Sequence, residues 1–123
     1  MSKAKVLIVD DAPTIRTLMS TLMDALGCDV VGQAQNGVEA EEMYLKHRPD
    51  LTLLDIEMPE KNGFETLRSL KKMDPTANIV MLTGHDDTAV AESCMSNGAR
   101  DFLQKGLSPH LFKQRLNKTL EAC

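Results

Sequence analysis

The sequence contains no long hydrophobic segment. Its longest apolar run near the amino terminus, Val6–Val9, is ended by Asp10 and Asp11. A secretory signal needs an apolar stretch of about 7–15 residues, and a membrane-spanning helix needs about 20. We therefore expect a cytoplasmic protein that neither carries a signal peptide nor enters a membrane.

The chain also lacks an excess of basic residues. Its 14 Lys and Arg residues are outnumbered by 18 Asp and Glu residues, and the net charge is −4. Nucleic acids are bound mainly by clustered Lys and Arg. We therefore expect no nucleic-acid partner.

Several other features are missing. The cysteines Cys28, Cys94 and Cys123 are odd in number and share no metal-binding spacing, which favours free thiols. No G-x-G-x-x-G motif follows the first apolar run, so a dinucleotide-binding role is disfavoured. No repeat, low-complexity tract or linker divides the 123 residues, and the length predicts one domain over residues 1–123.

Apolar runs rich in strand-forming residues alternate with segments of helical periodicity. Apolar spacings of three and four, with Ser108-Pro109 as a helix start, predict helices over residues 13–26, 38–46, 64–73, 88–96 and from 109 onward. The runs between them, KVLIVD, DVVGQA, LTLLD, NIVML and ARDFLQ, predict strands. This order predicts an α/β fold of five strand-helix units, a doubly wound parallel sheet with helices on both faces.

Polar residues follow the ends of the predicted strands. They are Asp10 and Asp11 after the first strand, Asp55 at the end of the third, Thr83 after the fourth and Lys105 after the fifth. Because the carboxyl ends of parallel strands meet at one edge of a sheet, we expect these side chains to converge. Taken alone, Asp10 and Asp11 are better explained as a strand end and a helix cap than as a functional site, and only the other strand-end residues reverse this interpretation.

Three carboxylates and one ammonium leave this edge with a net charge of −2. Two carboxylates about 4 Å apart repel by about 4 kcal/mol at an effective dielectric constant near 20, and a single Lys does not offset three acids. Oxygen ligands without thiolate or imidazole favour a hard cation such as Mg²⁺. Mg²⁺ beside a carboxylate nucleophile (Asp55), a hydroxyl (Thr83) and an ammonium (Lys105) indicates phosphoryl transfer.

The ordered set of motifs resembles the receiver domain of bacterial response regulators, and the length is that of the stand-alone chemotaxis type. The motifs are VDD at 9–11, LLDIEMP at 53–59, NG at 62–63, LTG at 82–84 and GARDFLQK at 98–105. The strand order 2-1-3-4-5 of a flavodoxin-like three-layer sandwich, for which flavodoxin and a chemotaxis receiver are the standard examples, comes from this resemblance alone.

The resemblance also implies roles for the site residues. Asp55 would accept a phosphoryl group from a sensor histidine kinase or a phosphotransfer protein. Mg²⁺ would be bound by Asp55, by Asp11 directly, by Asp10 through water, and by the backbone carbonyl of Glu57. Lys105 would contact the phosphoryl group. Such a protein is a phosphoacceptor in a two-component system, with at most slow self-phosphorylation and self-dephosphorylation, and is not an enzyme in the usual sense.

The same resemblance implies a conformational switch. Thr83 would move toward the phosphoryl group, and Phe102 would change rotamer. The readout face would comprise the predicted helix 88–96, the strand ARDFLQ and the last helix, and it would bind a target protein. We expect a monomer for which phosphorylation-driven dimerisation stays open.

The chain departs from the family pattern in three respects. Gly106 follows Lys105 where the family usually has a cis proline, and because a cis bond before a non-proline residue costs about 3 kcal/mol we expect a trans bond. Phe102 stands where Tyr is common. Glu57 and His85 occupy positions that influence hydrolysis of the phosphoryl group. Glu57 is expected either to pair with His85 or Lys105 or to point into water.

An enzyme reading remains as the alternative. Phosphatases of the haloacid dehalogenase type also use an Asp nucleophile with Mg²⁺ at a strand end, and they place a second acid two residues later, where Glu57 stands. The chain length, the absence of a cap insertion and the acidic pair at residues 10–11 argue against this class. Turnover of p-nitrophenyl phosphate distinguishes the two readings.

Overall fold

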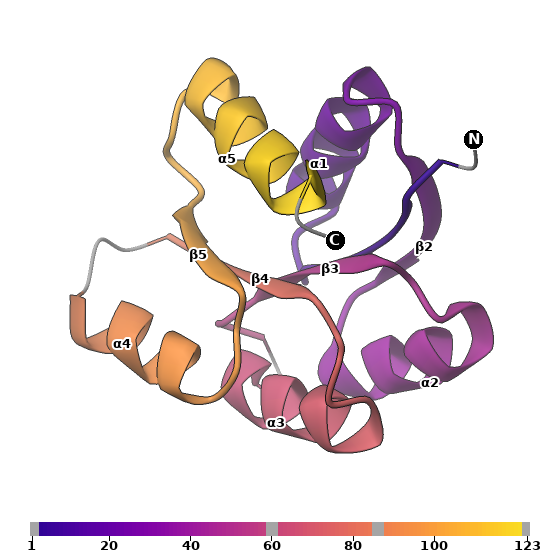
Figure 1. Ribbon diagram of the computed structural model, residues 1–123, viewed down its shortest axis with the longest axis vertical. Helices are drawn as coiled ribbons and strands as arrows, with labels where there is room; N and C mark the ends of the chain where they lie inside the picture. Colours follow the sequence, from indigo (N-terminus) through magenta and orange to yellow (C-terminus); the bar gives the residue numbers. More distant parts are fainter. Residues whose placement is uncertain (1–2, 59–61, 85–87, 122–123) are drawn as a thin grey trace.

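Strands and helices alternate along the computed structural model, which describes residues 3–58, 62–84 and 88–121 (Figure 1). The strands are β1 (Lys5–Val9), β2 (Asp29–Ala34), β3 (Leu51–Asp55), β4 (Ile79–Thr83) and β5 (Asp101–Gln104). The helices are α1 (Pro13–Ala25), α2 (Gly37–His47), α3 (Gly63–Met73), α4 (Thr88–Ser96) and α5 (Pro109–Glu121). The predicted order of elements is confirmed.

The strands form one parallel sheet in the order β2-β1-β3-β4-β5. The chain first moves outward from β1 to β2 and then returns past β1 to β3. The strand order therefore reverses between β1 and β3, and in open α/β sheets the crevice at the carboxyl ends of such a pair is the usual binding site. The fold class and the strand order expected from the sequence are both confirmed.

Helices cover both faces of the sheet. In Figure 1, α1 and α5 lie on one side, and α2, α3 and α4 lie on the other. Side chains of β1 alternate between the two: Val6 and Ile8 pack in the α1-α5 core, whereas Leu7 and Val9 pack in the core beneath α2, α3 and α4. All four are fully buried. This explains the unbroken apolar run, because a strand covered on both faces has no solvent-facing position.

Two helices begin one residue earlier than the apolar periodicity predicts. At α2 the Asn36 side chain accepts a hydrogen bond from the backbone N–H of Glu39 at 2.9 Å. At α3 the Asn62 side chain accepts one from Glu65 at 3.0 Å. An Asn that bonds the third following N–H is a helix cap, and the helix then starts at the next residue. Glycine occupies that first position in both helices.

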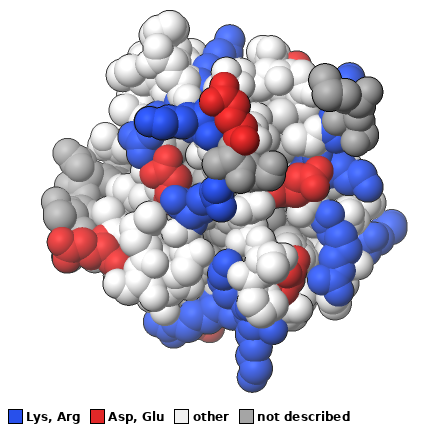
Figure 2. Space-filling model, viewed as in Figure 1, with Lys and Arg blue, Asp and Glu red and all other residues white. Residues whose placement is uncertain are grey.

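Cys28 and Cys94 are buried free thiols, as predicted, and Cys123 lies outside the described residues. Within the ranges that the structure describes, no helix has the length and apolar character needed to cross a membrane. On the face of the molecule shown in Figure 2, acidic and basic side chains are interspersed.

Candidate functional site

The predicted site residues lie at the carboxyl edge of the sheet. Asp10 follows β1 directly, and Asp55 is the last residue of the neighbouring β3, at the point where the strand order reverses. Thr83 ends β4 and accepts a hydrogen bond through its carbonyl oxygen from the backbone N–H of Lys105 at 2.7 Å. The strand ends thus bring residues separated by up to 95 positions in the sequence to one place.

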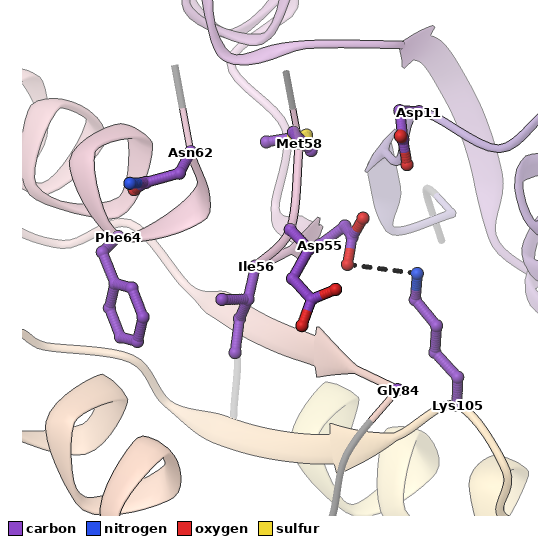
Figure 3. Close-up of a pocket in the computed structure, with 9 residues that line it drawn as sticks. Asp11, Asp55, Ile56, Met58, Asn62, Phe64, Gly84 and Lys105 are labelled. Atoms are coloured by element: carbon purple, nitrogen blue, oxygen red, sulfur yellow. Dashed lines mark ion pairs between the residues drawn. The ribbon is translucent and has the colours of Figure 1, made fainter. Parts of the chain in front are cut away.

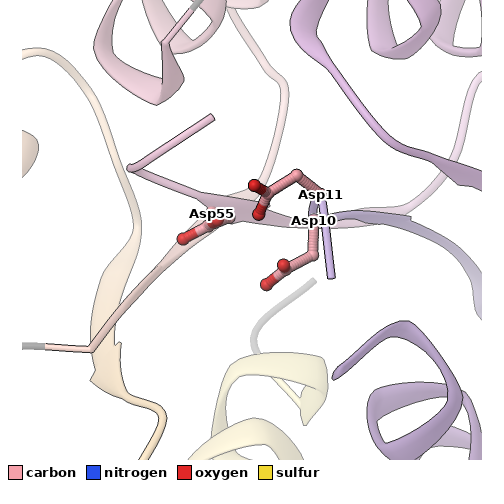
Figure 4. A group of neighbouring side chains, drawn as sticks. All are labelled: Asp10, Asp11 and Asp55. Carbon is pink, nitrogen blue, oxygen red and sulfur yellow. The ribbon is translucent and has the colours of Figure 1, made fainter. Parts of the chain in front are cut away.

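Asp10, Asp11 and Asp55 form a compact group of carboxylates (Figure 4). One carboxylate oxygen from each residue lies within 4.8 Å of those of the other two. Asp10 and Asp55 are buried, with exposed fractions of 0% and 2%, whereas Asp11 is exposed. Two buried carboxylates side by side are costly unless a cation is close, because burial weakens the solvation of each charge.

Lys105 supplies part of that positive charge. Its ammonium nitrogen lies 2.7 Å from Oδ2 of Asp10 and 3.1 Å from Oδ1 of Asp55. Figure 3 shows its side chain reaching from the end of β5 toward Asp55. Burial acts to lower the pKa of Lys105, but hydrogen bonds and charge interactions with the two acids outweigh this effect, and its pKa lies above the ordinary value. The ammonium is therefore held in its charged form.

The surroundings of Asp55 change its pKa. Burial, reinforced by the charge of Asp10, raises its pKa to about 6. Lys105 and a hydrogen bond from the backbone N–H of Glu57 act in the opposite direction but do not cancel the effect of burial. Near neutral pH the carboxylate is ionised, and it is more basic than an exposed aspartate. Raised basicity is expected of a carboxylate that acts as a nucleophile.

Gly63 allows α3 to approach the tip of β3. A Cβ atom at this position would collide with the carbonyl oxygen of Asp55 and would lie 2.6 Å from Cα of Ile56. The N–H of Gly63 instead donates a hydrogen bond to the carbonyl oxygen of Ile56 at 2.8 Å. The Asn62-Gly63 pair therefore caps α3 and also fixes the backbone that carries Asp55. The sequence displayed this pair as a family motif, but the steric reason appears only in the structure.

An open pocket of about 730 Å³ lies over the acids (Figure 3). Its lining residues are Asp11, Asp55, Ile56, Glu57, Met58, Asn62, Phe64, Gly84 and Lys105. The acidic side thus adjoins an apolar side. The apolar lining residues were not singled out by sequence reasoning, because in sequence they are indistinguishable from core positions.

The remaining predicted residues occupy varied surroundings. Thr83 is buried, and Phe102 is half-buried against the core beneath α2, α3 and α4. The Glu57 side chain is exposed, and of its two suggested partners, His85 and Lys105, the histidine lies outside the described ranges. Across the described residues no peptide bond is cis, so the predicted trans bond between Lys105 and Gly106 is confirmed.

The donor set of the acidic group suits Mg²⁺. Among the residues that the structure describes, the group consists of carboxylates alone, without thiol or imidazole, and Asp11 leaves one side open to solvent. Mg²⁺ prefers oxygen ligands and commonly retains several waters, so a partly exposed cluster of carboxylates meets its requirements. The net negative charge that remains after pairing with Lys105 also favours a divalent cation.

Comparison with known proteins agrees with this geometry. The family model of the response regulator receiver domain matches residues 6–117. The chain belongs to this family. It is 37% identical to the chemotaxis protein CheY of Thermotoga maritima over 93% of this chain and 95% of that protein. It is 35% identical to the chemotaxis protein CheY of Bacillus subtilis over 94% of this chain and 97% of that protein.

Solved receiver structures share the fold. The structure of the CheX-CheY-BeF3-Mg²⁺ complex from Borrelia burgdorferi superposes with a TM-score of 0.91 at 27% identity, over 95% of this chain and 89% of that one. The chemotaxis protein CheY4 of Vibrio cholerae superposes with a TM-score of 0.88 at 29% identity, over 96% and 99% of the two chains. Receivers of this type are signalling proteins of two-component systems, and this chain is a CheY-like receiver.

Proposed function

We propose that this receiver accepts a phosphoryl group on Asp55 from a histidine kinase or a phosphotransfer protein, with Mg²⁺ as cofactor. The convergence of Asp10, Asp11 and Asp55 with the ammonium of Lys105 is the observation that carries the proposal. We further propose that the protein is cytoplasmic, that it has no membrane or nucleic-acid partner, and that it is monomeric before phosphorylation.

The transfer itself is a displacement at phosphorus. A carboxylate oxygen of Asp55 attacks the phosphorus of a phosphohistidine, an O–P bond forms, the N–P bond breaks, and the leaving imidazole keeps the electron pair and takes up a proton. Lys105, already beside Asp55, stays within reach of the phosphoryl oxygens and offsets their charge. Thr83, at the end of the neighbouring strand β4, would donate its hydroxyl hydrogen to one of them.

The acids would hold the cofactor. Asp55 and Asp11 are assigned to direct contact, Asp10 to contact through water, and Glu57 to contact through its backbone carbonyl. Bound Mg²⁺ neutralises charge on the phosphoryl group and on the carboxylates. The exposure of Asp11 leaves this side open to exchange of water and cation.

Phosphorylation would pass the signal on by changing the conformation of one face of the protein. Phosphorylation shifts Thr83 toward the new group and Phe102 to another rotamer, which changes the face made by α4, β5 and α5. The shift is limited to the difference in interaction free energy between the two conformations. This face then binds a downstream target protein. Similarity to CheY proteins over nearly their full length favours a chemotaxis pathway.

Mass spectrometry tests the acceptor assignment. The protein is incubated with acetyl phosphate and Mg²⁺, and the expected result is a gain of one phosphoryl mass that Asp55→Asn and removal of Mg²⁺ with EDTA both abolish. Asp24→Asn, which changes an exposed carboxylate on α1, is the matched control and should be labelled like wild type. Equal labelling of the Asp55→Asn protein would refute the assignment.

Two further measurements separate the alternatives. Beryllofluoride with Mg²⁺ mimics the phosphoryl group, and it should shift amide resonances of α4, β5 and α5 in wild type but not in Asp55→Asn. Steady multiple turnover of p-nitrophenyl phosphate would instead favour the haloacid dehalogenase reading. The family assignment and the acidic pair after β1 both weigh against that reading.

A further inference from the structure

Arg16 is bonded to the backbone that carries the acidic pair. It lies in α1, six residues after Asp10, and its guanidinium Nη1 donates a hydrogen bond to the carbonyl oxygen of Asp10 at 2.7 Å. The side chain is half-buried. Neither the family motifs quoted above nor the strand-end rule points to this residue.

The carbonyl of Asp10 lies just beyond the sheet ladder. The pairing of β1 with both neighbouring strands ends at Val9, and the last bond on this side runs from the N–H of Asp10 to the carbonyl of Ala34 at 3.0 Å. A buried backbone carbonyl past the end of a ladder needs another donor. Arg16 provides it.

Two hydrogen bonds accepted by Asp10 therefore hold the short link between β1 and α1. Its carboxylate Oδ1 accepts a hydrogen bond from the N–H of Ala12 at 2.9 Å, and its carbonyl accepts the one from Arg16. Ala12 has no side-chain cap to offer α1. The carbonyl that Arg16 bonds belongs to the Asp10-Asp11 peptide, and the orientation of this peptide sets the direction of the Asp11 side chain.

We propose that Arg16 is a positioning residue for the magnesium site, which acts by fixing the Asp10-Asp11 peptide so that the Asp11 carboxylate faces Asp55. The inference rests on the proposed function, because it assumes that these acids bind Mg²⁺. Arg16 itself would contact neither the cation nor the phosphoryl group. Residues that orient metal ligands commonly change metal affinity by about 10–100-fold when they are replaced.

A role of Arg16 through its charge and a role through positioning predict opposite effects of Arg16→Met on Mg²⁺ affinity. Removing a positive charge close to a cation site should tighten Mg²⁺ binding if charge alone matters. Losing the hydrogen bond to Asp10 should weaken it by about tenfold if the peptide must be held. A purely structural role in α1 would lower thermal stability and leave the affinity unchanged.

The test is a Mg²⁺ titration followed by NMR through the amide signals of Asp11 and Ala12, with no phosphoryl donor present. The variants are Arg16→Met and Arg16→Lys, with Arg68→Met as the matched control. Arg68 is an exposed residue of α3, and its guanidinium donates a hydrogen bond to Asn97 at 3.2 Å. We expect a dissociation constant about tenfold higher for Arg16→Met, a smaller increase for Arg16→Lys, and no change for Arg68→Met. Lys keeps the positive charge but not the planar guanidinium. If Arg16→Met does not fold, the Mg²⁺ affinity of Arg16→Lys therefore tests the positioning role.

Phosphorylation kinetics provide a second readout. With acetyl phosphate as donor, Arg16→Met should need more Mg²⁺ for half-maximal rate and reach a plateau rate close to that of wild type. Unchanged or tighter Mg²⁺ binding in Arg16→Met, or an Arg16→Lys affinity equal to wild type when Arg16→Met is unfolded, would overturn the inference. Absence of any Mg²⁺ response in wild type would overturn the proposed function as well, so the two failures are distinguishable.

Discussion

The ammonium of Lys105 lies 2.7 Å from Oδ2 of Asp10, a carboxylate with no exposed surface. The same ammonium reaches Asp55 at 3.1 Å, so one cation joins the ends of β1, β3 and β5. A buried acid without a compensating charge is strongly destabilising. Lys105 therefore contributes to folding in addition to its proposed contact with the phosphoryl group.

Replacement of this lysine should lower stability in a way that magnesium reverses. We expect Lys105→Met to reduce the free energy of unfolding by about 2 kcal/mol in EDTA, because a hydrogen bond between charged groups contributes roughly that amount. Excess Mg²⁺ should restore part of the loss, since the cation neutralises the same acids. Urea unfolding followed by circular dichroism measures both values. Lys118→Met, an exposed position on α5, should change little, and an equal loss in both variants would contradict the prediction.

The pKa of Asp55 leads to a pH-dependent difference between wild type and Asp55→Asn. The pKa is raised from 3.8 to about 6 by folding, so ionised Asp55 destabilises the native state. Its favourable contribution is complete below the unfolded-state pKa and is lost as the pH rises through about 6. Without metal, the stability of Asp55→Asn relative to wild type should therefore rise between about pH 4 and about pH 6 and then level off, at a total gain of at most about 3 kcal/mol.

Urea unfolding in EDTA across this pH range checks the sign and the midpoint. The difference in stability between the two proteins should grow between about pH 4 and about pH 6, and Mg²⁺ should remove it at neutral pH because the cation favours the ionised carboxylate. Asp24→Asn controls for the loss of an exposed carboxylate. A gap that is constant with pH would show that Asp55 does not titrate in the predicted way.

The parts of the site that the sequence predicts are those that depend on strand ends. Asp10, Asp55 and Lys105 each follow an apolar run, and parallel strands bring such positions together whatever the details of packing. Arg16 could not be predicted in the same way, because its contact with Asp10 depends on the rotation of α1 about its own axis. Gly63 depends on how closely α3 approaches β3, which side-chain patterns do not encode.

The bounds of the helices and strands were also only partly predictable from the sequence. Apolar periodicity locates the body of α2 and α3, but the first residue of each is set by an Asn side chain that bonds a backbone N–H. The strand order was available only from the family resemblance, since strand-helix alternation is compatible with more than one order. The trans bond after Lys105 was predictable from the identity of Gly106, because only proline makes the cis form common.

Close packing at Gly63 predicts a loss of both stability and acceptor activity. In Gly63→Ala the new Cβ meets the backbone of Asp55 and Ile56, and backbone cannot rotate away as a side chain can. Overpacking of this kind costs about 1–3 kcal/mol. Because the displaced backbone carries the acceptor carboxylate, phosphorylation by acetyl phosphate should also slow at saturating Mg²⁺.

Gly106→Ala is the matched control for this substitution. A Cβ at Gly106 would have no atom within 4 Å, although the residue directly follows Lys105. Thermal melts and initial phosphorylation rates of the two variants should therefore differ clearly. Wild-type stability in Gly63→Ala would mean that α3 can move away from β3 at little cost.

At Thr52, in contrast to Gly63, we expect a substitution that stabilises the protein. This residue of β3 is fully buried, and among the described residues its hydroxyl oxygen has no hydrogen-bond partner. A buried hydroxyl without a partner costs about 1–3 kcal/mol, whereas a methyl group of similar size carries no such penalty. Thr52→Val should raise the free energy of unfolding by about 1 kcal/mol, with Thr52→Ser as the variant that keeps the hydroxyl and loses the methyl. Urea unfolding should rank Val above Thr and Thr above Ser, and a less stable Val variant would show that the hydroxyl is solvated or bonded in solution.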